Sequence, residues 1–109
     1  MKKTRLPLET WRQEWIRAFK TTATTAEHFL NNFNEVKHLI RSFDGNEFLE
    51  LYQDKQDTRI FFTYSYWKNE SALEKYRKSA LFNEVWTNTK TLFAEKPEAW
   101  SVNKLDTLL

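Results

Sequence analysis

The sequence contains no cysteine, one glycine and two prolines among its 109 residues. Without cysteine the chain has no disulfide, no thiolate nucleophile, no Cys-bound zinc and no iron–sulfur cluster. One glycine, Gly45, cannot supply a GxGxxG dinucleotide loop, a Walker-type phosphate loop or a GxSxG nucleophile elbow. These absences exclude several common classes of enzyme active site.

The chain also lacks a strong charge imbalance and a long apolar run. Lys and Arg number 17 against 15 Asp and Glu, a net charge of +2, and the pI of about 8.9 does not reach the range that marks a nucleic-acid-binding domain. No apolar stretch approaches the ~20 residues of a membrane span, and no apolar segment of a signal peptide follows the basic N-terminus. We therefore expect a cytoplasmic protein that binds neither nucleic acid nor membrane.

Aromatic residues, by contrast, are plentiful: nine Phe, five Trp and four Tyr make up 17% of the chain. A chain of this length forms one domain with one modest core. Since each aromatic side chain can bury about 150–250 Å², we expect some of them to line a cavity or a subunit interface.

The hydrophobic pattern predicts strands separated by helices. A shift of the apolar phase near Ser79 indicates a break in the second helical region. The order β-α-β-β-α-β is typical of a ferredoxin-like α+β fold, in which helices cover one face of a four-stranded antiparallel sheet. Residues 1–13 have no clear period, so they are interpreted as an N-terminal arm before a domain at 14–109. The expected strands span 14–22, 47–53, 58–67 and 99–105, and the expected helical regions begin near residues 24 and 71.

Three local signals predict where the helices begin and end. Thr24 with Glu27, and Ser71 with Glu74, have the spacing of a capping box, so Thr24 and Ser71 are the predicted N-caps. Gly45 follows the first helix and is the residue best able to adopt the left-handed conformation of a C-terminal cap.

The strand at 58–67 is apolar on both of its faces. Phe61 and Trp67 lie on one face, whereas Phe62, Tyr64 and Tyr66 lie on the other. If helices cover the first face, the second exposes apolar area of the kind that marks an interface. We therefore predict a homodimer that packs sheet against sheet.

The segment at 66–73 (YWKNESAL), followed by Tyr76, Phe82 and Lys96-Pro97, resembles the antibiotic biosynthesis monooxygenase superfamily. The resemblance covers about residues 14–105. It implies a dimeric ferredoxin-like domain with a pocket between helices and sheet in each subunit. The superfamily includes cofactor-free monooxygenases of polycyclic aromatics, haem-degrading monooxygenases and members without known activity.

The haem-degrading branch implies an Asn on the first strand, a Trp at the end of the third and a His in the last helix. Trp67 matches the tryptophan. The asparagine position falls near Arg17, and the histidine position falls on Trp86. The indole nitrogen is a donor only and cannot bind iron, so these departures argue against haem degradation, and we expect no cofactor.

The cofactor-free branch requires less of the protein. The enolate or phenolate of the substrate passes an electron to oxygen, and the protein binds the aromatic molecule, holds it deprotonated and excludes water. Arg17, between Trp15 and Phe19 on one strand face, can stabilise such an anion, and Trp67 is the second candidate catalytic residue. The candidate substrate-binding residues are Phe33, Tyr66, Tyr76 and Trp86.

Each candidate also has a purely structural explanation. Trp67, Trp86 and Tyr76 fit apolar positions of a core, and the stem of Arg17 can cover apolar surface while its head reaches water. No residue is a strong general base. The alternative function is therefore a non-catalytic module, on the same fold, that binds a small molecule or dimerises.

Other polar residues predict no further site. Lys75, Arg77 and Lys78 form a small basic cluster that is interpreted as a solvated helix face. His28 and His38 are ten positions apart on one helix, which places them about 80° apart and makes them a poor metal pair. We expect no metal site.

Overall fold

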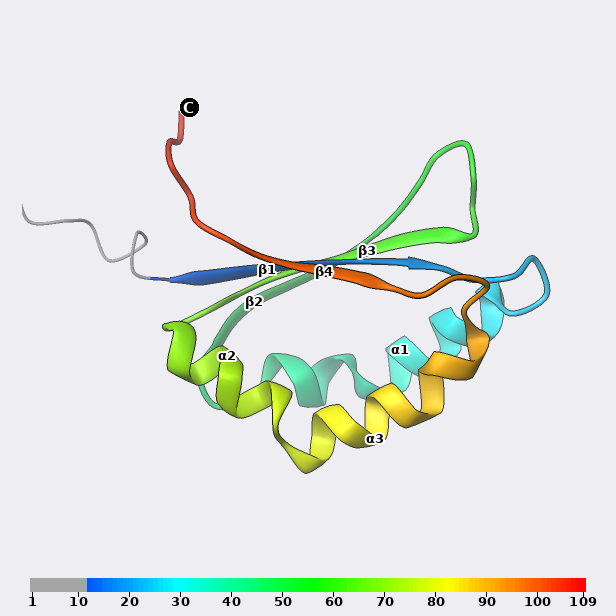
Figure 1. Cartoon of the computed structure of the whole chain (residues 1–109), viewed down its shortest axis with the longest axis horizontal. Helices are drawn as coiled ribbons and strands as arrows, with labels where there is room; N and C mark the ends of the chain where they lie inside the picture. The colour runs from blue at the N-terminus through cyan, green and yellow to red at the C-terminus, as the bar shows by residue number, and fades with distance from the viewer. Residues whose placement is uncertain (1–11) are drawn as a thin grey trace, which may run out of the picture.

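A computed structural model describes residues 12–109 and shows one antiparallel sheet with strand order β2-β3-β1-β4. All helices cover the same face of this sheet (Figure 1). The predicted ferredoxin-like α+β fold is therefore confirmed. The elements are β1 (Gln13–Lys20), α1 (Ala26–Arg41), β2 (Asn46–Gln53), β3 (Ile60–Trp67), α2 (Glu70–Arg77), α3 (Ala80–Thr89), the 3-10 turn η2 (Lys90–Leu92) and β4 (Glu98–Val102).

The predicted arm lies almost wholly outside the described residues. Its last residue, Gln13, already belongs to β1, where it pairs with Trp67 of β3. Within residues 12–109, no helix is long and apolar enough to cross a membrane.

Alternation along the two central strands separates the covered face of the sheet from the open one. Trp15 and Phe19 of β1 and Phe61 and Trp67 of β3 are buried beneath the helices. In the register, Phe19 lies opposite Phe61. The two faces predicted for 58–67 are thus confirmed, because successive side chains of a strand point to opposite sides.

The helix-covered core consists of two clusters rather than one. One contains Trp15, Trp67 and Tyr76 with Ile40 and Leu73. The other contains Phe19, Phe29 and Phe61 with Leu92. Arg17 occupies the β1 position between Trp15 and Phe19 on this same face, so a charged side chain stands where the two clusters meet.

The predicted capping boxes are wrong in their cap residues. Helix α1 begins after Thr25, not Thr24, and Thr25 makes no side-chain cap. Its hydroxyl instead donates to the Leu92 carbonyl at 2.7 Å. The Thr25 side chain is thus used to fasten the start of α1 to η2, a tertiary contact that sequence spacing does not reveal.

Helix α2 begins after Asn69, two residues before the predicted cap Ser71. The Asn69 Oδ1 atom accepts a hydrogen bond from Ala72 N at 2.9 Å. Asn is as good an N-cap as Ser, and it comes first along the chain. The predicted break near Ser79 is confirmed, since α2 ends at Arg77 and Ser79 caps α3 by accepting a hydrogen bond from Phe82 N at 3.0 Å.

Gly45 adopts the predicted left-handed conformation, with φ of +90°. It is not the helix cap, however, because α1 ends at Arg41 and Ser42 is its C-cap. Gly45 lies in the following turn, which Asn46 N closes by donating to the Phe43 carbonyl at 2.9 Å. A Cβ on Gly45 would lie 2.5 Å from the Cβ of Ala72, so this turn also requires glycine for space.

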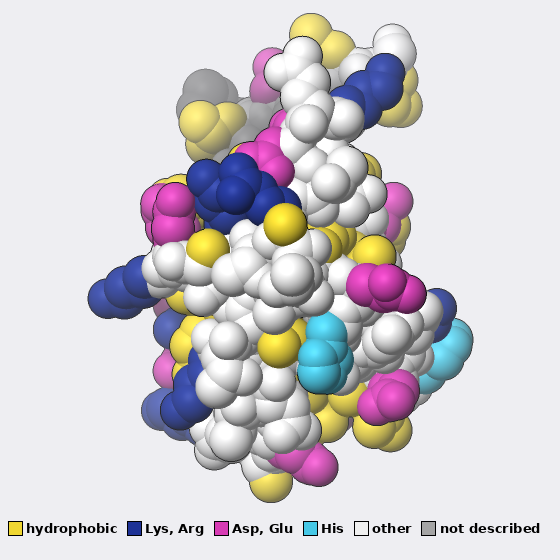
Figure 2. All heavy atoms as spheres, turned by 90° about the vertical axis from the view of Figure 1, so that its right-hand side faces the viewer, with side chains coloured by type: hydrophobic (Ala, Val, Ile, Leu, Met, Phe, Trp, Pro, Cys, Tyr) yellow, Lys and Arg dark blue, Asp and Glu magenta, His cyan; other side chains and the backbone are white. Residues whose placement is uncertain are grey.

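The open face of the sheet carries a band of aromatic and aliphatic side chains. Tyr52 of β2, Phe62 of β3 and Trp100 of β4 are 47%, 37% and 45% exposed. The C-terminal segment and the β2–β3 turn rise on this side, away from the helices (Figure 1). At the end of the molecule in Figure 2, acidic and basic side chains alternate and apolar atoms form only small, separate patches.

Candidate functional site

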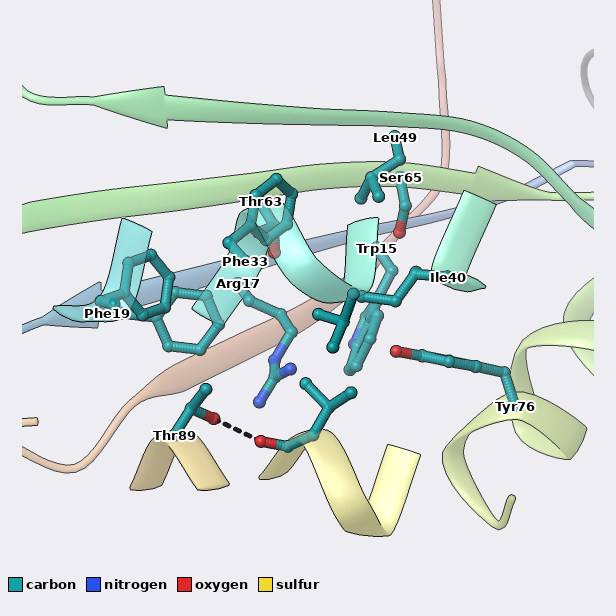
Figure 3. Close-up of a pocket in the computed structure, with 13 residues that line it drawn as sticks. Trp15, Arg17, Phe19, Phe33, Ile40, Leu49, Thr63, Ser65, Tyr76 and Thr89 are labelled. Carbon is teal, nitrogen blue, oxygen red and sulfur yellow. Dashed lines mark hydrogen bonds between the residues drawn. The ribbon is translucent and has the colours of Figure 1, made fainter. Parts of the chain in front are cut away.

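A cavity of about 50 Å³ lies between the sheet and the helices, where the two core clusters meet. Its walls come from β1, β2, β3 and all three helices. Most of them are apolar, and Arg17 is the one charged residue among them (Figure 3). An apolar cavity of about 150 Å³ holds benzene, so this cavity is too small for a whole aromatic ring and can hold only part of one or a smaller molecule. The apolar lining comprises Trp15, Phe19, Phe29, Phe33, Val36, Ile40, Leu49 and Val85.

The Arg17 guanidinium lies among aromatic rings, and no carboxylate of residues 12–109 pairs with it. Its Cζ atom is 4.7 Å from the ring centre of Phe19, 4.9 Å from that of Trp15 and 5.4 Å from that of Trp86. Within residues 12–109, no acidic oxygen lies within 4 Å of it, and its buried Nε atom has no hydrogen-bond partner. Burial lowers the pKa of Arg17 to about 10, which leaves it charged at neutral pH.

An unpaired, largely buried cation attracts an anion strongly. Ring faces stabilise it by only ~0.5–2 kcal/mol each, and within residues 12–109 they leave its buried Nε–H without an acceptor. A buried donor without a partner costs about 1–3 kcal/mol. The arrangement around Arg17 therefore favours binding of a negatively charged ligand atom, as a preformed oxyanion site does.

Tyr76 of α2 places a second polar group at the cavity. Its hydroxyl points toward Ile40 and Trp15 at the cavity edge (Figure 3). Burial raises the pKa of Tyr76 to about 12, although the charge of Arg17 acts in the opposite direction. The hydroxyl therefore keeps its proton at neutral pH and can donate a hydrogen bond to a bound oxyanion.

Trp67 lies behind Tyr76 and does not line the cavity. It is 0% exposed, and its ring stacks on Tyr76 at 4.7 Å between centres. Its Nε1 donates to Ser65 Oγ at 3.0 Å, so its one polar atom is already satisfied. Trp67 thus holds Tyr76 in place, and Tyr76 fills the space beside it.

The four predicted substrate-binding residues are not all at one place. Phe33 and Tyr76 line the cavity with Arg17. Trp86 lies on the far side of the Arg17 guanidinium and lines a separate hollow near β4. Tyr66 lies on the open face of the sheet, stacked on Phe48 at 4.6 Å with the Arg12 guanidinium 4.7 Å from its ring.

Sequence reasoning did not single out Thr63, Ser65 or Thr89, which supply the other polar groups of the cavity wall. Thr63 and Ser65 alternate along β3 on the same face as Trp67, and this alternation could have predicted that they point toward the helices. Thr89 uses its hydroxyl to donate to the Val85 carbonyl at 2.8 Å. No pattern in the last helical region distinguishes Thr89 from its neighbours.

The two histidines lie on the outer surface of α1, well apart from each other (Figure 2). Neither one lines the cavity. Across residues 12–109, no three His, Asp or Glu side chains come together as metal ligands would.

Comparison with known proteins places this architecture among described families. The family model for antibiotic biosynthesis monooxygenases matches residues 13–87. A comparison with curated proteins gives no significant match.

Solved structures with the same fold share little sequence with this chain. A conserved protein from Methanosarcina mazei Go1 has a TM-score of 0.84 and 15% identity, over 89% of this chain and 96% of its own. A candidate antibiotic biosynthesis monooxygenase from Nitrosomonas europaea has a TM-score of 0.82 and 15% identity, over 92% and 96%. Another candidate from Caulobacter crescentus CB15 has a TM-score of 0.81 and 12% identity, over 89% and 92%. At such identities the likeness concerns the fold.

Proposed function

Because the chain belongs to the antibiotic biosynthesis monooxygenase family, we propose that it is a cofactor-independent monooxygenase of a small aromatic or enolisable substrate. The observation that carries this proposal is the buried, unpaired guanidinium of Arg17 at the edge of an apolar cavity. A cation at this place lowers the pKa of a phenol or enol bound against it. It therefore favours the electron-rich anion that reacts with oxygen.

The reaction balances without an external reductant when the substrate supplies all the electrons. A methylene beside an enolisable carbonyl or phenol becomes a carbonyl and loses four electrons and two hydrogens. Dioxygen takes the four electrons, and one of its atoms enters the new carbonyl while the other leaves as water. The protein contributes by binding the anion, orienting it and excluding water.

Each candidate residue has a distinct place in this scheme. Arg17 binds the oxyanion, and the protonated Tyr76 hydroxyl donates a second hydrogen bond to it. Phe33 closes the apolar side of the cavity, where dioxygen is as well accommodated as any small apolar molecule. Trp67 is a positioning residue, since it acts through the ring of Tyr76.

Oxygen consumption with a panel of phenols and cyclic 1,3-diketones tests the proposal. We expect Arg17→Gln to lower the rate about 100-fold, the usual loss when one oxyanion donor is removed. The matched control is Arg59→Gln, which removes an arginine that pairs with Asp57 in the β2–β3 turn. A folded wild-type protein that consumes no oxygen across the panel would contradict the proposal, as would equal rates in the two variants.

A second function is favoured by what lines the cavity. No carboxylate or imidazole is among its lining residues, so no strong base stands ready to remove a proton from the substrate. A non-catalytic module that binds a small anion uses the same Arg17 site. Such a module would gain thermal stability from the ligand while the oxygen concentration stays constant.

We further propose that two copies pair through the open face of the sheet. Exposed Tyr52, Phe62 and Trp100 come from three different strands of that face. Together they supply the apolar centre that a subunit interface needs. Charged residues at its margin, such as Glu50 and Glu98, supply a polar rim.

A further inference from the structure

A second hollow reaches Arg17 from the side of β4. This outer cleft has a volume of about 190 Å³ and lies where α2 and α3 meet the start of β4. Trp15 and Arg17 line both the outer cleft and the inner cavity, so the same guanidinium borders the two spaces. A ring too large for the 50 Å³ cavity fits the outer cleft, since about 150 Å³ suffices for benzene.

The outer cleft is positively charged. Arg17, Arg77 and Lys96 line it. The remaining charged residue, Glu98, pairs with Ala18 in the sheet, and Ala18 in turn pairs with Phe62 of the open face, so the Glu98 side chain lies on the open face. Arg77 makes only a surface ion pair with Glu74 at 3.6 Å, and Lys96 makes none within residues 12–109. The charges of Arg17 and Arg77 also repel each other, since Arg77 contributes to the lowered pKa of Arg17. A bound anion would relieve this repulsion.

The uncharged walls of the cleft are flat and aromatic. Both guanidinium groups lie near the Trp15 ring, with Arg17 Cζ at 4.9 Å and Arg77 Cζ at 5.6 Å from its centre. Trp86 and Phe82 flank Arg17, each with its ring centre 5.4 Å from the Cζ atom. Flat rings beside guanidinium forks suit a planar ligand that ends in a carboxylate, which arginine binds in its own plane.

We propose that the outer cleft binds the carboxylate and ring of a planar aromatic acid. This inference rests on the proposed function, which it deepens. The substrate is an aromatic or enolisable carboxylic acid whose ring and carboxylate lie in the outer cleft while its reactive edge meets Arg17. Arg77, which sequence analysis assigned to a solvated face with Lys75 and Lys78, then belongs to the binding site.

Titration of the wild-type protein with benzoate and with benzamide, followed by NMR of the indole N–H signals, tests the inference without any turnover. We expect benzoate to shift the signals of Trp15 and Trp86 and to leave Trp100, on the open face, unmoved. Benzamide has the same ring but no charge, and we expect it to bind more weakly. Equal affinity for the two, or shifts confined to Trp100, would overturn the proposal.

Variants of exposed residues give the second arm of the test. We expect Arg77→Gln and Lys96→Gln each to weaken benzoate binding about two- to fivefold, the range of a partly exposed charge pair. Arg77→Lys keeps the charge and retains most of the affinity. Lys75→Gln, outside the cleft, changes nothing. An equal loss of affinity in Lys75→Gln and Lys96→Gln would contradict a charge-based site.

The two proposals fail in distinguishable ways. If benzoate binds as expected but no phenol or diketone, with or without a carboxylate, consumes oxygen, the outer cleft stands and the monooxygenase proposal falls. If neutral substrates consume oxygen as fast as their carboxylated analogues, and Lys96→Gln leaves both rates unchanged, the monooxygenase stands and the carboxylate site falls.

Discussion

Arg17 has an energetic cost as well as a proposed role. A guanidinium that is largely removed from water without an acidic partner destabilises the fold, and within residues 12–109 the groups packed against that of Arg17 are aromatic rings. A purely structural design would place an apolar residue between Trp15 and Phe19. We therefore propose that a ligand provides the negative partner of this charge.

Replacement of Arg17 by methionine tests this balance directly. We expect Arg17→Met to raise the free energy of unfolding by about 1 kcal/mol, because a buried charge without a partner is exchanged for an apolar chain of similar length. Oxygen consumption and benzoate binding should be lost. Urea denaturation measures the first effect, and a variant that is less stable than the wild type would contradict it.

The pKa shifts add a pH dependence to the same comparison. The pKa of Arg17 is lowered to about 10, so the cost of burying its charge is present at neutral pH and is relieved as pH rises above 10. The pKa of Tyr76 is raised to about 12, so its stabilising contribution is present below its unfolded value near 10 and is lost as pH rises toward 12. In Arg17→Met the charge that lowers the pKa of Tyr76 is missing, so Tyr76 loses more of its stabilising contribution there as pH rises. We therefore expect the stability advantage of Arg17→Met to shrink between pH 9 and pH 12.

At the scale of single elements, side-chain caps decide where the second helical region is divided. Asn69 caps the start of α2, and Ser79 caps the start of α3 while its hydroxyl donates to the Tyr76 carbonyl in the last turn of α2. The break gives α2 and α3 different directions, so that Tyr76 of α2 contacts Trp67 and Trp86 of α3 contacts Arg17. The position of the site therefore depends on these two caps.

Alanine replacements distinguish the observed caps from the predicted one. We expect Asn69→Ala and Ser79→Ala each to lower the free energy of unfolding by about 1 kcal/mol, since each leaves a helix N–H without its acceptor. Ser71→Ala, at the position that the capping-box pattern favoured, should change stability by less than about 0.5 kcal/mol. Thermal denaturation of the three variants measures this order, and a larger loss in Ser71→Ala than in Asn69→Ala would refute it.

Gly45 lies in the turn that follows α1 and packs closely against the start of α2. Its φ of +90° is costly for other residues, and an added Cβ would meet the Cβ of Ala72. We expect Gly45→Ala to lower the free energy of unfolding by about 2–4 kcal/mol, from backbone strain and overpacking together. In an Ala72→Gly background the steric clash is absent and only the backbone strain remains. Gly45→Ala should therefore lower the free energy of unfolding by less in that background than in the wild type. An equal loss in the two backgrounds would mean that the close contact does not matter.

At the scale of the whole molecule, the two faces of the sheet differ in what covers them. The covered face packs against the helices and holds Arg17 with its cavity and cleft. The open face presents aromatic side chains from three strands. Since monomers rarely expose such contiguous apolar area, the open face is the surface on which we expect a second copy.

A charge placed in the centre of the open face tests this pairing. We expect the wild type to sediment at about twice the chain mass of 13.2 kDa and Phe62→Glu to sediment as a monomer, because a buried unpaired carboxylate opposes association. The matched control is Leu39→Glu, at a residue of α1 that is 57% exposed on the helical side. A monomeric wild type at micromolar concentration would contradict the pairing.

Local periodicity was sufficient to predict most of the fold. Alternation placed Phe61 and Trp67 on one face of β3 and Tyr66 on the other, and the phase shift at Ser79 located the helix break. Both are consequences of repeating backbone geometry, which short segments express without the rest of the chain. The caps were predicted less well, since Thr25 and Asn69 owe their roles to neighbours distant in sequence or to competition among adjacent residues.

What the sequence determined by itself is the type of fold and a charged residue, Arg17, between two aromatic ones on a covered strand face. Only the tertiary structure decided which of the candidates meet. It brought Phe33 and Tyr76 to the cavity, set Trp67 behind Tyr76, and moved Trp86, Arg77 and Lys96 to the outer cleft. The reason is physical: periodicity sets the direction of a side chain, whereas its neighbours depend on how separate elements pack.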